Sequence, residues 1–224
     1  GEHRKLKFNF DATGIGSVPF KEPHPALSLI FENFKSIPFW PQLPKRSFLE
    51  SMYVQYSEGL PGLVIDAARK TIHIDTAGAI REIEPTYAKY LEGDIEYFKI
   101  SKDHAEGLYA FMDEFGARAK DIKCVKGHIT GPISFALTVT NENKQAVMYD
   151  RDTFEVLTKV LCMKVRWQIR ELKKLFPSVM IFIDEPYLVS IGSSFVNINI
   201  EDAFSKLDEV IASIKEEGAL AGLH

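Results

Sequence analysis

The most informative stretch of the chain is VMIFIDEP, at residues 179–186. An unbroken apolar run of this length is typical of a parallel strand that is buried on both of its faces. Asp184 follows where the run ends, and Glu185 and Pro186 come directly after it. The stretch therefore predicts a central strand of an α/β fold with an acidic side chain at its carboxyl end.

Short apolar runs alternate with amphipathic helical patterns along the rest of the chain, which also favours an α/β fold. Further strands are expected to end within residues 12–19, 52–58 and 122–132, and a last one to occupy 219–224. Helices are expected over about 25–34, 85–92, 103–115, 151–175 and 201–217, with Asp150 capping the fourth of these. Two apolar runs, at 63–66 and 71–75, predict a β-hairpin that departs from the alternation.

These repeated βα units are expected to belong to a TIM (β/α)8 barrel, which usually has eight strands and about 250 residues. Residues 1–224 would then be a single partial barrel domain with about five of the eight strands and a β-hairpin excursion. The C-terminal part of the barrel would lie beyond residue 224. An open five-stranded sheet of the flavodoxin type is the structural alternative.

The composition restricts the class of protein. The 224 residues carry a net charge of −4, and Lys and Arg form no basic cluster, so a nucleic-acid partner is not expected. No apolar run approaches the roughly 18 residues of a membrane span, and the N-terminal residues do not resemble a signal peptide. Cys124 and Cys162 suggest no disulfide framework, which favours a cytoplasmic protein.

Candidate functional residues stand at the expected carboxyl ends of the strands, because these ends meet at one face of a parallel α/β fold. Gly16 lets the backbone approach a ligand closely, and Ser17 can hydrogen-bond a substrate carboxylate. Glu58 and Asp184 could hold an ammonium group together, although loop acids are usually just solvated. His224 is a usable zinc ligand, but a lone histidine is more often a hydrogen-bonded core residue.

Several pieces of sequence, taken in order, resemble the catalytic barrel of cobalamin-independent methionine synthase, in its short single-domain form. This family belongs to the wider superfamily that includes uroporphyrinogen decarboxylase. The matching pieces are Ile15-Gly16-Ser17, Ser57-Glu58, the KGHITGP stretch at 126–132, the IDEP stretch at 183–186, and Leu223-His224.

The resemblance implies a zinc-dependent methyltransferase that moves a methyl group from a methyl-corrinoid or a methylfolate to a thiol, most often homocysteine, to give methionine. It implies that His224 is the first residue of a His-x-Cys pair of zinc ligands and that Asp184 and His224 are catalytic. It also implies that Ile15, Gly16 and Ser17 bind the amino-acid substrate, while Glu58 and Asp184 hold its ammonium group. A free thiol ionises near pH 8.5, and zinc would lower that pKa to give a bound thiolate.

One position departs from the pattern of the folate-using members, which carry a Trp shortly after the Thr-Gly-Pro piece. Thr138 stands at that position here. Without this aromatic platform, methylcobalamin, either free or bound to a corrinoid protein, is favoured over methyltetrahydrofolate as the methyl donor.

Three alternatives remain open at this stage. A corrinoid-dependent coenzyme M-type methyltransferase would use the same metal with another thiol. A metal-free decarboxylase of the uroporphyrinogen type would want basic side chains around its acidic substrate, whereas these strand ends are mostly acidic. The chain could also be a non-catalytic fragment.

Overall fold

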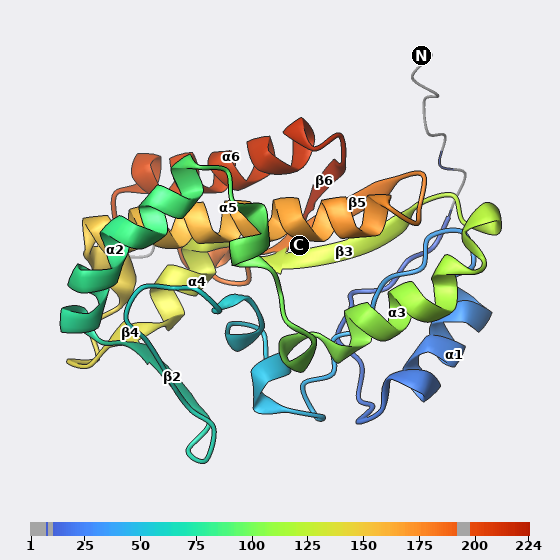
Figure 1. Ribbon diagram of the computed structural model, residues 1–224, viewed down its shortest axis with the longest axis horizontal. Coiled ribbons are helices and arrows are strands. Elements are labelled where there is room, and N and C mark those ends of the chain that lie inside the picture. The colour runs from blue at the N-terminus through green and yellow to red at the C-terminus, as the bar shows by residue number, and fades with distance from the viewer. Residues whose placement is uncertain (1–7, 9–10, 192–197) are drawn as a thin grey trace.

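The structure, a computed structural model, describes residue 8 and residues 11–191 and 198–224 (Figure 1). It confirms the mixed α/β class. One sheet is wholly parallel and has the order β3-β5-β6, with strands β3 (Val125–Thr130), β5 (Val179–Asp184) and β6 (Leu220–Leu223). The other has the order β1-β2-β4, with strands β1 (Leu63–Asp66), β2 (Thr71–Ile74) and β4 (Thr140–Asn141).

Two extended segments continue the parallel sheet on the far side of β3. Phe39 forms a parallel bridge with Lys126 of β3, and Ser17 forms a parallel bridge with Gln42. The Gln42 N–H donates to the carbonyl of Gly16 at 2.9 Å. Two segments and three strands therefore lie side by side in the order in which they occur along the chain.

The prediction of a strand at residues 52–56 is wrong. Val54–Tyr56 is a 3-10 helix, η2, and another one, η1, precedes it at Phe48–Glu50. The place in the sheet belongs to the segment around Phe39, which the sequence concealed because it holds Pro38 and Pro41. Proline cannot donate a ladder hydrogen bond, so this segment pairs through isolated bridges rather than a regular strand.

Most predicted helices are confirmed to within a few residues at their ends. The Asp150 carboxylate accepts a hydrogen bond from the Thr153 N–H at 2.8 Å and so caps the longest helix as predicted. The helix expected from residue 85 begins earlier, behind an Asp75 cap, and contains Pro85. The helices are α1 (Pro23–Asn33), α2 (Thr76–Leu91), α3 (Glu106–Gly116), α4 (Pro132–Thr138), α5 (Arg151–Lys173) and α6 (Ile200–Glu216).

Five more 3-10 helices join these elements: η3 (Ile95–Phe98), η4 (Lys102–His104), η5 (Ala119–Asp121), η6 (Val147–Tyr149) and η7 (Leu188–Ser190). Within the described ranges, no helix combines the length and the apolar character needed to cross a membrane.

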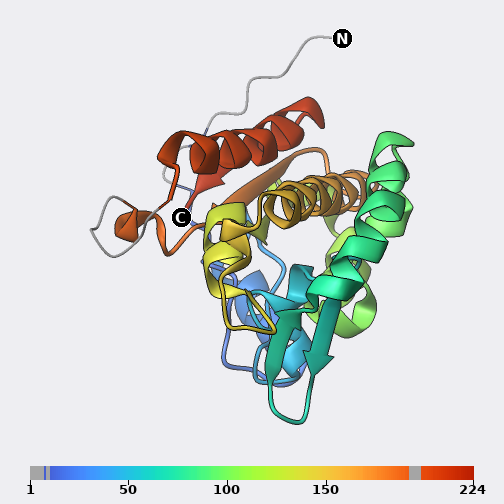
Figure 2. The same cartoon turned by 90° about the vertical axis from the view of Figure 1, so that its left-hand side faces the viewer.

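The predicted β-hairpin is confirmed. β1 and β2 pair antiparallel, with Leu63 opposite Ile74 and Asp66 opposite Thr71. Lys70 adopts a left-handed conformation in the turn, with φ of 53°. The hairpin projects from the body of the molecule (Figure 2), so it lies apart from the parallel sheet.

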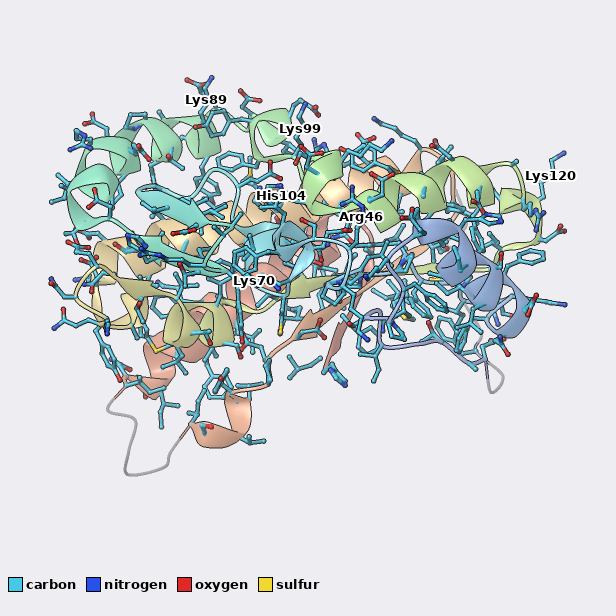
Figure 3. The ribbon with its side chains drawn as sticks, turned by 90° about the horizontal axis from the view of Figure 1, so that it is seen from below. Arg46, Lys70, Lys89, Lys99, His104 and Lys120 are labelled. Atoms are coloured by element: carbon cyan, nitrogen blue, oxygen red, sulfur yellow. The ribbon has the colours of Figure 1, made fainter. Side chains whose placement is uncertain are left out.

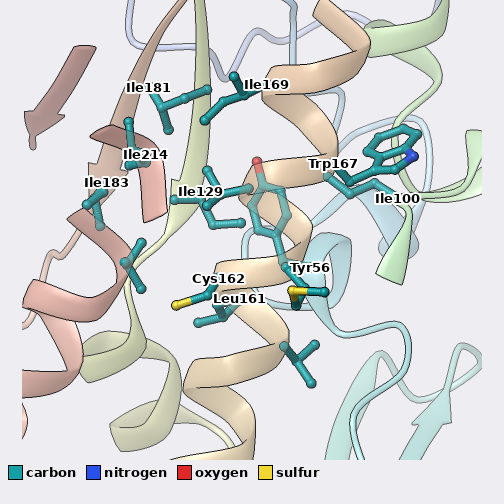
Figure 4. Close-up of a cluster of buried hydrophobic side chains, with 14 of the residues drawn as sticks. Tyr56, Ile100, Ile129, Leu161, Cys162, Trp167, Ile169, Ile181, Ile183 and Ile214 are labelled. Carbon is teal, nitrogen blue, oxygen red and sulfur yellow. The ribbon is translucent and has the colours of Figure 1, made fainter. Parts of the chain in front are cut away.

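The main core lies between the parallel sheet and the helices α5 and α6. Ile129, Ile181 and Ile183 extend from the strands toward Leu161 and other apolar residues of these helices (Figure 4). Each fully buried side chain of this size contributes about 1.5–3 kcal/mol relative to an exposed one. This packing fixes one face of the sheet against the helices.

A glutamine from α5 completes the contact between helix and sheet. The Gln168 side chain accepts a hydrogen bond from the Trp40 indole N–H at 2.9 Å and donates one to the His128 carbonyl at 2.9 Å. A Cβ atom at Gly127 would lie only 2.0 Å from Oε1 of Gln168. The helix can therefore approach β3 this closely only because residue 127 has no side chain.

We predict that Gly127→Ala lowers the free energy of unfolding by roughly 1–3 kcal/mol, because the methyl group must displace Gln168 from its hydrogen bonds. Gly116→Ala is the matched control, since its Cβ would meet only Leu175 side-chain atoms at 3.4 Å or more. Urea unfolding of both variants measures the difference. Equal stability of the two variants would contradict the close approach.

Candidate active site

A cavity of about 320 Å³ opens at the carboxyl ends of the parallel segments. Ile15, Ser17, Asp184 and His224, which the sequence placed at strand ends, all line it. The remaining wall comes from Gln42, Pro44, Glu50, Ser51, Met52 and Pro186. Of these, only Met52 and Pro186 fall in stretches that the sequence analysis marked as strands or strand ends.

Asp184 and His224 meet because of the parallel pairing of β5 and β6. The His224 N–H donates to the Ile183 carbonyl and the Glu185 N–H donates to the His224 carbonyl, both at 2.9 Å. This register places Nδ1 of His224 3.4 Å from Oδ1 of Asp184, with the imidazole 58% exposed and the carboxylate 13% exposed. The two side chains form an ion pair when the imidazole is protonated.

Burial dominates the electrostatics of Asp184. It raises the pKa of this carboxyl above its usual value, while the charges of His224 and Lys126 act in the opposite direction. An additional cation in the cavity would therefore stabilise the ionised form of Asp184.

Ile15 and Ser17 reach the cavity on either side of a glycine. Gly16 has φ of +123°, and a Cβ there would come within 2.9 Å of the His128 ring. The close approach that this glycine allows is therefore to His128, and Gly16 is absent from the described lining of the cavity. Its role is to turn the backbone so that its two neighbours face the cavity.

Glu58 lies elsewhere. Its Oε1 accepts a hydrogen bond from the Ser101 N–H at 2.8 Å and lies 3.3 Å from Nδ1 of His104. Figure 3 shows His104 near the middle of the molecule, between the more distant Lys89 and Lys120. Glu58 is not among the described residues that line the cavity. The strand that was expected to place it there is instead a 3-10 helix at residues 54–56.

Glu185 faces away from the cavity and holds α4. Its carboxylate accepts hydrogen bonds from the N–H groups of Ile133 and Ser134 and from the Ser134 hydroxyl, at 2.7–2.9 Å. These are unpaired donors at the first turn of a helix, where a carboxylate is also favoured by the helix dipole. Glu185 therefore joins the end of β5 to the helix that follows β3.

Glu50 lines the cavity, and only one of its two carboxylate oxygens, Oε2, has a hydrogen-bond partner. Its side chain is fully buried, and Oε2 accepts a hydrogen bond from the Arg46 guanidinium at 3.0 Å. Burial raises the pKa of this carboxyl, while Arg46 and the N–H groups of Glu106 and Gly107 lower it. The carboxylate thus faces Arg46 and the first turn of α3.

The backbone around Met52 is fixed by β3. The Thr130 hydroxyl donates to the Met52 carbonyl at 2.6 Å, and Thr130 pairs with Asp184 in the sheet. Tyr53 follows, with its ring 5.9 Å from that of Phe135 in an edge-to-face arrangement. The sequence did not predict this wall, because a strand was expected from Met52 onward where the structure has the 3-10 helix η2.

His128 is a fully buried neighbour of the cavity wall. Its Nε2 lies 3.3 Å from the Trp40 carbonyl, which can only accept, so Nε2 carries the proton. The Tyr56 hydroxyl lies 2.5 Å from Nδ1 and donates to the His128 carbonyl at 2.9 Å, so these two acceptors share its one proton. Burial, assisted by the charge of Lys126, lowers the pKa of His128 to about 3.

The two cysteines are not suited to metal binding or nucleophilic attack. Burial raises the pKa of Cys124 and of Cys162 to about 11. Within the part of the chain that the structure describes, no group of three or more His, Cys, Asp or Glu residues could hold a metal ion. Among the described residues of the cavity wall, His224 is the only histidine, and its exposed imidazole could bind a metal ion.

Comparisons of the chain with protein-family models, curated proteins and solved structures find no match.

We predict that the buried state of His128 makes stability depend on pH. Its pKa is lower in the folded protein than in the unfolded chain, which therefore binds the proton first as the pH falls. The contribution of His128 to the free energy of unfolding should decrease between pH 6.5 and about 3, by about 1.4 kcal/mol per pH unit in mid-range. Urea unfolding across this range should show a flatter slope in His128→Gln, whereas His24→Gln, an exposed control, should keep the wild-type slope.

Proposed function

We propose that this chain is a zinc-dependent methyltransferase that transfers a methyl group to the thiol of homocysteine, giving methionine. The observation that supports it most is the meeting of Ser17, Asp184 and His224 around one small cavity at the carboxyl ends of parallel segments. Parallel α/β enzymes bind their substrates at this end of the sheet.

We further propose that the parallel sheet is part of a TIM (β/α)8 barrel. Two segments and three strands in sequence order, with α1 following the first segment and α5 and α6 packed outside the later strands, support this assignment. A doubly wound sheet would instead reverse its strand order at some point. No reversal occurs among the described parallel elements.

The cavity suits an amino acid in size. Its volume of about 320 Å³ lies at the lower end of the range for small-molecule sites. The Asp184 carboxylate would hold the substrate ammonium by charge-assisted hydrogen bonds, and the Ser17 hydroxyl would donate to the substrate carboxylate. Burial keeps water from competing for Asp184, which strengthens its contact with a bound cation.

Zinc fits the chemistry of His224 in part. A carboxylate at one imidazole nitrogen orients the ring and makes the other nitrogen a better ligand, and Asp184 stands in that position at Nδ1. The described residues supply no complete set of ligands, so a zinc ion here would need others from outside them. When bound, zinc would lower the pKa of the substrate thiol and leave a thiolate as the nucleophile.

Either methyl donor, a methyl-corrinoid or methyltetrahydrofolate, stays within the proposal. Thr138 lies exposed at the end of α4, and it has no aromatic ring on which a folate could stack. Tyr53 lies within hydrogen-bond reach of Thr138. This contact lowers the pKa of Tyr53, whereas burial raises it. An aromatic ring is therefore near this position, which weakens the argument against a folate. A corrinoid protein as partner and a cytoplasmic location belong to the same proposal.

The alternatives fit the cavity less well. Neither Lys nor Arg is found among the described lining residues, so a substrate with several carboxylates would lack countercharges there. Coenzyme M carries a sulfonate and no ammonium, which leaves the Asp184 carboxylate without a role and adds a repulsive charge.

We predict that the purified full-length protein contains zinc and methylates homocysteine, and that His224→Ala loses most of both. His24→Ala, which changes an exposed histidine of α1, is the control and should keep both. Metal analysis and methionine formation from methylcobalamin or methyltetrahydrofolate are the measurements. Full activity after chelation, in protein without zinc, would overturn the proposed function.

We predict that Asp184→Asn lowers kcat/KM for homocysteine about 100-fold, mainly through KM, because a charge-assisted bond worth roughly 2–3 kcal/mol is lost. Asp113→Asn, on the exposed side of α3, is the matched control. Glu58→Gln tests whether Glu58 contacts the substrate, as the family resemblance implies, or lies away from it, as the cavity lining indicates. A loss in this variant as large as that in Asp184→Asn would mean that Glu58 reaches the substrate after all.

A further inference from the structure

Lys126 is a buried lysine for which the proposed chemistry gives no role. It is the second residue of β3 and is only 4% exposed. Its backbone pairs on both sides, since its N–H donates to the Pro38 carbonyl at 2.9 Å and it stands opposite Met180 of β5. Burying a lysine side chain at this position costs free energy unless its ammonium is bound by other groups.

The ammonium is bound by the segment that leads into the cavity. Nζ donates hydrogen bonds to the carbonyls of Gly14 and of Ile15, the second at 3.3 Å, and lies 4.6 Å from the centre of the Phe182 ring. Burial lowers the pKa of Lys126, and the charge of Asp184 opposes that effect.

The segment at 14–17 packs its glycines against Phe39 and His128, but its backbone has few hydrogen bonds that fix its path. Its regular backbone pairing begins only at Gly16, which accepts from the Gln42 N–H, and continues with the Val18 N–H donating to the Gln42 carbonyl. Ile15 is 63% exposed, so its side chain does not anchor the segment in the core. Two glycines close to each other also leave the unbound segment many conformations.

We propose that Lys126 is a positioning residue whose ammonium holds the carbonyls of Gly14 and Ile15 and thereby sets Ile15 and Ser17 in the cavity wall. Its place in substrate binding rests on the proposed function, whereas its hold on the segment does not. One positive group then contacts the first segment of the sheet and faces the acid on β5, so it relates the two sides of the cavity.

The test removes the ammonium while keeping the length of the side chain. Hydrogen exchange of the intact protein is followed by mass spectrometry in Lys126→Met, Lys126→Arg and Lys123→Met. Lys123 is the matched control, because it also binds an N-terminal residue, Asp11, at 2.6 Å but stands before β3. We expect peptides that contain residues 14–18 to exchange about 10- to 100-fold faster in Lys126→Met only, with Arg restoring most of the protection.

The proposal would be overturned if residues 14–18 of Lys126→Met exchanged hydrogen at the same rate as in the wild-type protein. So would faster exchange that extends equally over β3 and β5, because Lys126 would then only stabilise the fold. If Lys126→Met does not fold, Lys126→Gln is the second neutral variant, with the same expected and opposing results. None of these readouts depends on the reaction that the protein catalyses.

Kinetics provides the second readout once methyl transfer to homocysteine is established in the wild type. Lys126→Met should raise KM for the thiol about 10- to 100-fold and change kcat much less, because the substrate site is displaced while its chemistry is kept. Lys126→Arg should recover a KM near that of the wild type. A fall in kcat alone would overturn the positioning role. A wild type that does not methylate homocysteine would refute the proposed function and leave the exchange result standing.

Discussion

The parallel pairing of β3, β5 and β6 is the constraint on which the site depends. It sets Thr130 opposite Asp184 and Ile183 opposite Leu223, so the polar residues that follow the strands emerge at one edge. A slip of one residue would turn every side chain of a strand to the other face. The apolar residues Ile181 and Ile183 prevent such a slip, because they would leave the core beneath α5. Hydrophobic packing on one face therefore fixes the geometry of the polar groups at the end.

Short polar contacts hold the pieces around this sheet together. Gln168 joins α5 to β3 and to the segment around Phe39, and Glu185 joins β5 to α4. These contacts satisfy buried polar groups of the backbone and of the Trp40 indole, which would otherwise cost about 1–3 kcal/mol each. The stretches that suggested a family in the sequence thus carry structural duties as well: Gly127 makes room for Gln168, and Glu185 caps a helix.

The sequence predicted the elements whose signals are local. The apolar run at 179–183 and the helical spacing of 151–175 and 201–217 depend only on neighbouring residues, and all three elements formed close to the expected bounds. The segment around Phe39 escaped prediction because its pairing depends on distant strands and its prolines interrupt the usual ladder. Because a strand was predicted at residues 52–56, Glu58 was also predicted, wrongly, to lie at the cavity. Gln42 was missed because it reaches the wall through long-range contacts.

Charge balance gives the cavity its character. Three groups of different kinds approach one another from separate segments: the Asp184 carboxylate, the His224 imidazole, and the Lys126 ammonium behind them. Both bases partly neutralise Asp184, yet burial still raises its pKa, so the site favours one more positive group. A zwitterionic amino acid supplies that group without bringing a net charge into a buried space. An anionic thiol without an ammonium group would add negative charge beside the same carboxylate, and this difference in charge is the physical basis for preferring an amino acid as the acceptor.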